Sequence, residues 1–138
     1  MRELINIVVE TFYQKAINDV LIGYHFRKFQ DPEVLHHHLE RITSFWEMQL
    51  TGQTSIPVSG KPFQLLFTHL NLSIKPGELG RWIVLFHQTL DELEHAMKEQ
   101  KASEEEMNSI SLISIEWKKR IKFFEERFKS HPIMFKKD

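Results

Sequence analysis

The sequence contains no cysteine, which excludes disulfides, cysteine-ligated zinc, iron–sulfur clusters and thiol nucleophiles. It has almost no net charge either: 18 Lys and Arg stand against 19 Asp and Glu, so there is no basic footprint for nucleic acid or an anionic membrane. No run of 18 apolar residues predicts a membrane span, and no apolar signal core follows Met1. These absences favour a cytoplasmic protein that binds neither nucleic acid nor membranes.

Glycine and proline are also scarce, with five of each, and they occur in clusters. The long segments between them carry apolar residues at intervals of three and four, which is the period of an α-helix. A chain of 138 residues with 41% hydrophobic residues has the size and composition of one globular domain. We therefore predict an all-α protein with a single domain over residues 1–129 and a frayed C-terminal tail over 130–138.

Start and stop signals place the first two long helices. An apolar stripe predicts a helix over residues 2–18, and a shorter irregular stretch follows it. Asp31 and Pro32 are a typical helix start, since Asp accepts hydrogen bonds from first-turn amides and Pro suits the first helical position. This second helix is expected to end near Leu50, because Gly52 is a typical residue for a helix end.

Two more long helices follow a predicted loop over residues 52–61 and a short helix over residues 62–67. Pro76 is expected to open the third long helix, and Ser103 with Glu106 forms a capping box for the fourth. Gly80 is an unusual choice inside the third helix, where it costs up to about 1 kcal/mol relative to Ala. We interpret Gly80 as a residue that allows close backbone approach.

Aromatic residues and histidines are abundant, with 11 Phe, 3 Trp, 2 Tyr and 8 His. Within the triplet His36-His37-His38, helical spacing places only His38 on the apolar face. Neighbouring residues on a helix point about 100° apart, so the triplet does not chelate one metal as a unit. Tyr13 and Trp82 also lie on apolar faces and carry a polar group that needs a partner when buried. Spacing alone favours ordinary core residues for all three.

His69 has a different setting, in a link between helices and between apolar neighbours such as Phe67 and Leu70. Such an imidazole suits the axial ligation of a haem iron and suits an ordinary loop histidine equally well. A non-haem metal enzyme that uses His36, His37 and His69 is disfavoured, because no carboxylate-rich Glu-x-x-His pairs accompany them. The residues by themselves leave a haem pocket and a plain aromatic core both open.

Four pieces of sequence together carry a family resemblance: Phe12-Tyr13 with Phe26 thirteen residues after the Tyr, His38 with Phe45 and Trp46 seven and eight residues later, the run from His69 to Trp82, and the segment from Phe86 to Glu92. At these residues the sequence resembles the group III branch of the truncated haemoglobins. The resemblance covers about residues 3 to 125. Each piece alone is weak, and the combination is fairly specific.

The resemblance implies a truncated globin fold, a two-over-two helical sandwich that binds haem b (iron protoporphyrin IX). His69 would be the proximal iron ligand, and the distal donors around O₂ or another diatomic ligand would be Tyr13, His38 and Trp82. The haem-facing residues would be Phe26, Phe45, Trp46 and Phe86. The implied function is tight O₂ binding, or chemistry on O₂, NO or peroxide with an unidentified reductase. Activity of the NO-dioxygenase or peroxidase type stays open.

One departure from the family concerns the iron ligand itself. The segment from Pro62 to His69 is about three residues longer than is usual in the family. Aligned from Trp82, His69 takes the ligand position; aligned from Pro62, Leu66 takes it, and the chain becomes a haem-free globin-like sensor or protein-interaction module. We favour His69, because the run to Trp82 must hold the ligand against the pocket, whereas a helix absorbs an insertion upstream.

Overall fold

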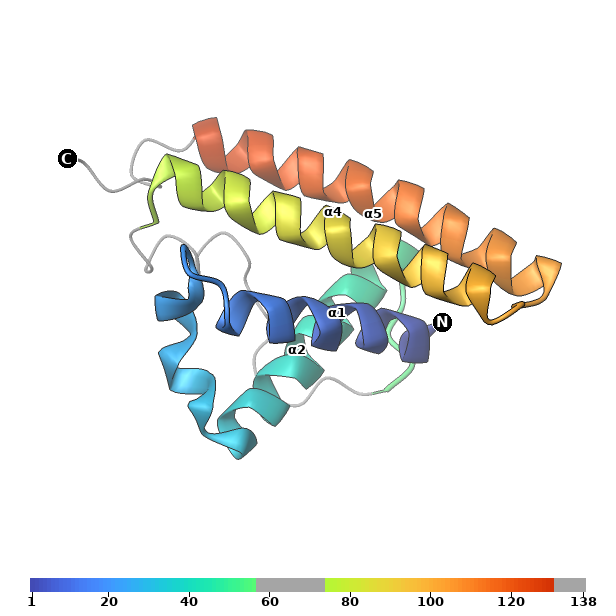
Figure 1. Ribbon diagram of the computed structural model, residues 1–138, viewed down its shortest axis with the longest axis horizontal. Coiled ribbons are helices and arrows are strands. Elements are labelled where there is room, and N and C mark those ends of the chain that lie inside the picture. The colour runs from blue at the N-terminus through green and yellow to red at the C-terminus, as the bar shows by residue number, and fades with distance from the viewer. Residues whose placement is uncertain (57–73, 131–138) are drawn as a thin grey trace.

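The computed structural model describes residues 1–56 and 74–130, and the elements it shows there are helices (Figure 1). They are α1 (Arg2–Ile17), the 3₁₀ helix η1 (Gly23–Gln30), α2 (Pro32–Thr51), α4 (Pro76–Glu99) and α5 (Glu104–Ser130). The predicted all-α class is confirmed. Within these ranges, no helix combines the length and the apolar character that a membrane crossing requires.

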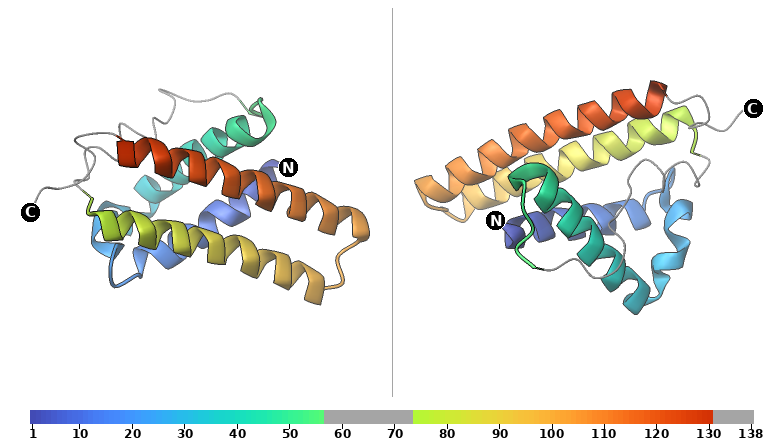
Figure 2. Two further views of the ribbon diagram at one scale, coloured as in Figure 1. Left: turned by 90° about the horizontal axis from the view of Figure 1, so that it is seen from above. Right: turned by 180° about the vertical axis from the view of Figure 1, so that it is seen from behind.

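The long helices form two layers of two (Figure 1). Helices α4 and α5 run side by side in opposite directions, and α1 and α2 lie across from them. Helix α1 packs against both α2 and α4, and α2 also reaches α5. Figure 2 shows the two pairs from above and from behind. This is the two-over-two arrangement that the resemblance implies.

The ends of α2 follow the predicted chemistry. The Asp31 side chain accepts a hydrogen bond from the Glu33 amide at 2.9 Å, and Pro32 is the first helical residue. At the other end Gly52 has φ of 80°, in the left-handed region, and its amide donates to the Met48 carbonyl at 2.9 Å. Both boundary predictions are confirmed, because both depend on residues within one turn of the helix end.

The start of α5 also matches its predicted signal. The Glu106 amide donates to Ser103 Oγ at 3.1 Å, and the Ser103 amide donates to Glu106 Oε1 at 3.3 Å. This is the reciprocal capping box, which satisfies two amide groups that the helix itself leaves without acceptors. Helix α4 begins at Pro76, as predicted.

The stretch after α1, predicted only as irregular, contains η1. Phe26 and Phe29 are three residues apart and both buried, which fits the three residues per turn of a 3₁₀ helix. Gly23 opens this helix very close to the end of α1. A Cβ atom at position 23 would stand 2.7 Å from the Ile17 carbonyl oxygen, so only glycine fits there without a shift of the backbone.

The interpretation of Gly80 is wrong. A Cβ atom at position 80 would meet no atom of the described residues within 4 Å, because Gly80 lies on the exposed side of α4. No close backbone approach therefore requires glycine there. The backbone is that of an ordinary helix, where Ala is the better residue.

Two other expectations concern residues outside the described ranges, namely the short helix over residues 62–67 and the tail over residues 131–138. The tail was expected to begin at Ser130. The structure corrects this boundary by one residue, since Ser130 is the last residue of α5.

The core is built around aromatic rings, and each of the four long helices supplies one of them. Trp46 from α2 lies 5.8 Å from Phe86 of α4 and 5.2 Å from Trp117 of α5, measured between ring centroids. Phe12 from α1 lies 4.6 Å from Phe86. Rings of this size bury large apolar areas, so this cluster holds the two layers together.

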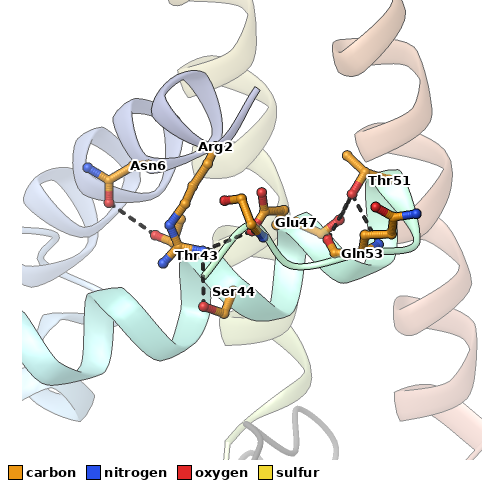
Figure 3. A network of polar contacts seen from close by, with 8 residues as sticks. Arg2, Asn6, Thr43, Ser44, Glu47, Thr51 and Gln53 are labelled. Atoms are coloured by element: carbon orange, nitrogen blue, oxygen red, sulfur yellow. Dashed lines mark hydrogen bonds and ion pairs between the residues drawn. The ribbon is translucent and has the colours of Figure 1, made fainter. Parts of the chain in front are cut away.

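A polar network connects the start of α1 to the second half of α2 (Figure 3). Arg2 Nη1 donates to Ser44 Oγ and to Glu47 Oε1, both at 3.0 Å. We call these three residues the N-terminal clasp. The Ser55 amide also donates to Glu47 Oε1, at 2.9 Å, so the clasp fixes the chain that leaves α2 as well.

Glu47 is ionised in the clasp although it is buried. Burial pushes the pKa of the carboxyl group up, but the hydrogen bonds from Ser55 and Arg2 and the charge of Arg2 outweigh it and hold the pKa below its usual value. One turn later than Arg2 along α1 and one turn earlier than Glu47 along α2, Thr43 Oγ1 donates to Asn6 Oδ1 at 3.1 Å. The start of α1 is thus held by satisfied polar contacts.

Candidate functional site

A cavity of about 120 Å³ opens between the two layers, lined by side chains from α1, η1, α2, α4 and α5. A single water molecule needs roughly 10–15 Å³ of the same kind of space, so this cavity accommodates a much larger molecule. Its described wall is mainly aromatic: Phe12, Phe26, Phe29, Trp46, Trp82, Phe86, Phe124 and Phe128. The polar and charged members of the wall are Tyr13, His25, Lys28, His38 and Glu125.

Tyr13 and His38 form a hydrogen-bonded pair in this wall, with 2.7 Å between the tyrosine hydroxyl oxygen and Nε2 of the imidazole. We call them the cavity pair. Phe29 stacks on the His38 ring at 4.3 Å between centroids, and Phe26 meets the Tyr13 ring edge-on at 5.5 Å. Burial raises the pKa of the Tyr13 hydroxyl, so this group stays neutral at physiological pH.

The turn between α1 and η1 sets the position of these rings. Asp19 Oδ2 accepts hydrogen bonds from the amides of Leu21 and Ile22, at 3.0 and 3.2 Å, and this fixes the reversal of the chain. Helix η1 can then return beside the end of α1. Its aromatic residues consequently pack against Tyr13, which lies in the last turns of α1.

The same aspartate connects this turn to α4. Arg81 donates from Nε at 3.0 Å and from Nη2 at 2.7 Å to Asp19 Oδ1. The Arg81 hydrogen bonds hold the pKa of Asp19 below its usual value. Trp82, the next residue, lines the cavity, with its ring centroid 5.9 Å from that of Phe26. The ion pair therefore helps to place Trp82 in the wall.

A second polar cluster lies on the cavity wall at the start of α4. Glu78 Oε1 accepts from the Lys75 amide at 2.8 Å, and Oε2 accepts from the Tyr24 hydroxyl. Nε2 of His25 lies 3.3 Å from the same Oε2. Burial raises the pKa of Glu78, but the hydrogen bonds from Tyr24 and Lys75 and the nearby His25 imidazole outweigh burial and lower it.

Sequence reasoning missed this cluster as a site. The available signal for Glu78 is its place three residues after Lys75, where a glutamate is typical of a helix start, as for Glu106. His25 has no comparable signal, since it lies in the stretch predicted only as irregular. The contribution of α5 was recognised as an apolar stripe, but its place in the cavity wall was not.

The structure brings most of the predicted site residues together. The cavity is lined by Tyr13, Phe26, His38, Trp46, Trp82 and Phe86. Phe45 is not among the described lining residues, and its ring packs instead at 5.3 Å from Trp46 and 5.9 Å from Phe124. The partner that the Tyr13 hydroxyl needs when buried is Nε2 of His38.

The iron-ligand prediction for His69, and the alternative with Leu66 in that place, both concern residues outside the described ranges. Residues 1–56 and 74–130 contain no group of three or more His, Asp or Glu that could hold a metal ion. His36 and His37 are exposed on α2, with His36 Nε2 at 3.3 Å from Glu40 Oε1.

Comparison with known proteins finds similarity at the level of structure. No protein-family model matches the chain, and no curated protein matches it. The structure is similar to the crystal structure of a group III truncated haemoglobin from Campylobacter jejuni, with a TM-score of 0.60, 24% sequence identity and 95% of each chain covered. The chain therefore has the truncated globin fold.

Proposed function

We propose that this protein binds haem b in the cavity and uses the cavity pair to hold O₂ or another diatomic ligand. One observation supports the proposal above all: a Tyr13–His38 hydrogen bond of 2.7 Å stands in an otherwise aromatic cavity of a truncated globin fold. The solved structure of similar fold is a haemoglobin by its name.

The residues present fit such a group. A porphyrin is flat and largely apolar, and Phe26, Trp46 and Phe86 offer ring faces and edges to it. Lys28 supplies a cation at the cavity for a propionate. His69 is the residue that we propose as the iron ligand. The haem, when bound, supplies reversible O₂ binding in which negative charge moves onto the outer oxygen.

Whether the cavity pair can donate a hydrogen bond to such charge depends on the tautomer of His38. If Nε2 carries the proton, it donates to the Tyr13 oxygen, and the Tyr13 O–H is available to the ligand. If Nε2 lacks the proton, Tyr13 donates its hydroxyl proton to Nε2 and has none left for the ligand. We propose the first arrangement for the ligand-bound protein, with Trp82 as a further donor. Fixed donors in a dry cavity stabilise charge more than water does.

Several donors slow the release of O₂. Delivery of oxygen requires quick dissociation, so we propose tight O₂ binding, or chemistry on O₂, NO or peroxide, in place of transport. NO-dioxygenase or peroxidase activity would require electrons from a reductase, which is the partner we propose. A cytoplasmic location remains a prediction.

Reconstitution with haemin tests the proposal. The purified protein is expected to give a sharp Soret band, and its ferrous and CO forms are expected to have the spectra of a histidine-ligated haem. His69→Ala should lose the five-coordinate ferrous spectrum, whereas Leu66→Ala should retain it. A chain that gives no Soret band is instead the haem-free sensor or interaction module, and a wild-type spectrum in His69→Ala would show that the ligand assignment is wrong.

A further inference from the structure

We propose that Tyr24, Glu78 and His25 form a proton-transfer path between solvent and the cavity. The path rests on the proposed function for its use, because protons are gained or lost when O₂, NO or peroxide reacts. Its geometry is independent of that function. The path involves neither Tyr13 nor His38, so it adds a second polar feature to the cavity.

The three side chains run from the surface to the cavity wall. Tyr24 is 47% exposed, and its hydroxyl donates to Oε2 of the buried Glu78. Nε2 of His25 lies 3.3 Å from the same oxygen, and the His25 side chain is only 5% exposed while it lines the cavity. One carboxylate oxygen therefore lies between the hydroxyl of a half-exposed tyrosine and an imidazole that lines the cavity.

Capping of α4 does not account for this arrangement. The cap needs a single acceptor, and Glu78 Oε1 fills that role by accepting from the Lys75 amide at 2.8 Å. The capping glutamate of α5, Glu106, performs the same task while exposed to solvent. Glu78 differs from Glu106 in its burial and in having its second oxygen turned to Tyr24 and His25.

The surroundings hold the His25 ring in place. The centroid of the Tyr24 ring lies 4.1 Å from that of His25, and the centroid of the Trp82 ring, in α4, lies 6.2 Å from it. Within residues 1–56 and 74–130, the titratable groups that meet the ring are Tyr24 from η1 and Glu78 from α4. The separation of 3.3 Å between Nε2 and Oε2 does not have the alignment of a hydrogen bond. Such pairs are often long before ligand binding and tighten afterwards.

The proton balance of the path is simple. Inward, water gives a proton to the Tyr24 oxygen as the Tyr24 proton passes to Glu78, and Glu78 passes it on to Nε2 of His25. The ring starts as the Nδ1–H tautomer, and the resulting imidazolium gives its Nδ1 proton to the bound ligand or to water in the cavity. The ring returns to its first tautomer by exchange with water before it carries another proton. Outward, each step reverses. Only O–H and N–H bonds form and break, and no electron is transferred.

The first test uses the haem-free protein and measures by NMR how fast the His25 ring proton exchanges with water. Glu78→Gln keeps an oxygen for the cap and removes the ionisable group, so exchange should slow about 100-fold, the lower end of what a positioned acid or base contributes. Tyr24→Phe should slow it less. Glu106→Gln, the matched change in the other capping box, should leave it unchanged. Wild-type exchange in both Glu78→Gln and Tyr24→Phe would overturn the path.

The second test uses the haemin-loaded ferric protein and the association rate of cyanide. Hydrogen cyanide must lose its proton as the anion is taken up, and the path should carry that proton outward. We expect the same order of rates: wild type and Glu106→Gln fastest, Tyr24→Phe slower, Glu78→Gln slowest. Equal rates in all four proteins would contradict the proposal.

The two tests separate the path from the proposed function. A protein without a Soret band refutes haem binding, and the exchange rates still decide the path. A protein with a normal Soret band and unchanged rates refutes the path alone. Circular dichroism confirms folding of each variant; should Glu78→Gln fail to fold, Tyr24→Phe decides, because the ring remains and only the hydroxyl of a half-exposed residue is lost.

Discussion

Two of the polar links between α1 and α2 differ in kind. The N-terminal clasp joins the start of α1 to the second half of α2 through an ion pair, in which Arg2 and Glu47 are 3.0 Å apart and Glu47 has a further donor (Figure 3). The cavity pair joins the end of α1 to the start of α2 through one hydrogen bond between Tyr13 and His38. The first link is a satisfied structural contact, whereas the second lies beside open space.

The difference follows from what each environment does to charge. A buried carboxylate is tolerable in the clasp because Arg2 and the Ser55 amide compensate the loss of water. Tyr13 in the cavity is different, because burial keeps its hydroxyl neutral by raising its pKa. A neutral hydroxyl beside a cavity retains the ability to donate to an incoming ligand. We therefore expect the clasp to govern stability and the cavity pair to govern ligand binding.

Tyr13→Phe should produce the largest effect and should separate the two links. It removes a donor to the charged end of a bound ligand, which is worth about 1.5–3 kcal/mol, so O₂ should dissociate about 10- to 100-fold faster in stopped-flow measurements. The free energy of unfolding should fall by no more than about 1.5 kcal/mol, the value of one ordinary hydrogen bond. Glu106→Gln, a change at an exposed residue of α5, serves as the control, and an O₂ off-rate unchanged in Tyr13→Phe would rule out its distal role.

Arg2→Ala should have the opposite profile. It leaves the carboxylate of Glu47 buried without its cation, and we expect a loss of about 1–3 kcal/mol in the free energy of unfolding, measured with urea. The O₂ off-rate should stay at the wild-type value. Arg120→Ala, which changes an exposed arginine of α5, is the control and should cost far less. Similar losses in the two variants would mean that the clasp is not a stabilising contact.

Acid should weaken the N-terminal clasp, because protonation removes the charge of the Glu47 carboxylate. Its pKa in the folded protein lies below the ordinary value of 4.5, so its contribution to stability is present above that value and is lost as pH falls through the folded pKa. Compared with wild type, Glu47→Gln should be less stable at pH 7 and should lose about 1 kcal/mol less between pH 5 and pH 3. If the free energy of unfolding changed with pH in the same way in both proteins, this expectation would be wrong.

Gly80→Ala should have the smallest effect on stability, and Gly80 belongs to neither the N-terminal clasp nor the cavity pair. Its Cβ atom would meet open space on an exposed helix, so we expect a gain of about 0.4–1 kcal/mol, seen as a higher melting temperature. Gly23→Ala is the contrasting variant, because its Cβ atom would stand 2.7 Å from a backbone oxygen. The melting temperature should fall in that protein. A loss of stability in Gly80→Ala would show that the position has a role the packing does not reveal.

The helices could be predicted to within a few residues because their signals are local. Asp31 and Gly52 act on amides and carbonyls no more than four residues away. Helix η1 was missed, since three-residue spacing in an eight-residue stretch is too short to distinguish from irregular chain. The apolar faces correctly included His38 and Tyr13, but the hydrogen bond between them spans 25 residues and was not predicted.

The sequence by itself determined the all-helical class, the ends of α2 and α5, and the apolar faces that carry Tyr13, His38 and Trp82. These properties depend on residues within one or two turns of each other, where spacing and capping chemistry act directly. Only the tertiary structure decided which side chains share the cavity, and it alone joined Tyr24 to Glu78 across 54 residues. Such contacts depend on how whole helices pack, and no local pattern in the chain records that packing.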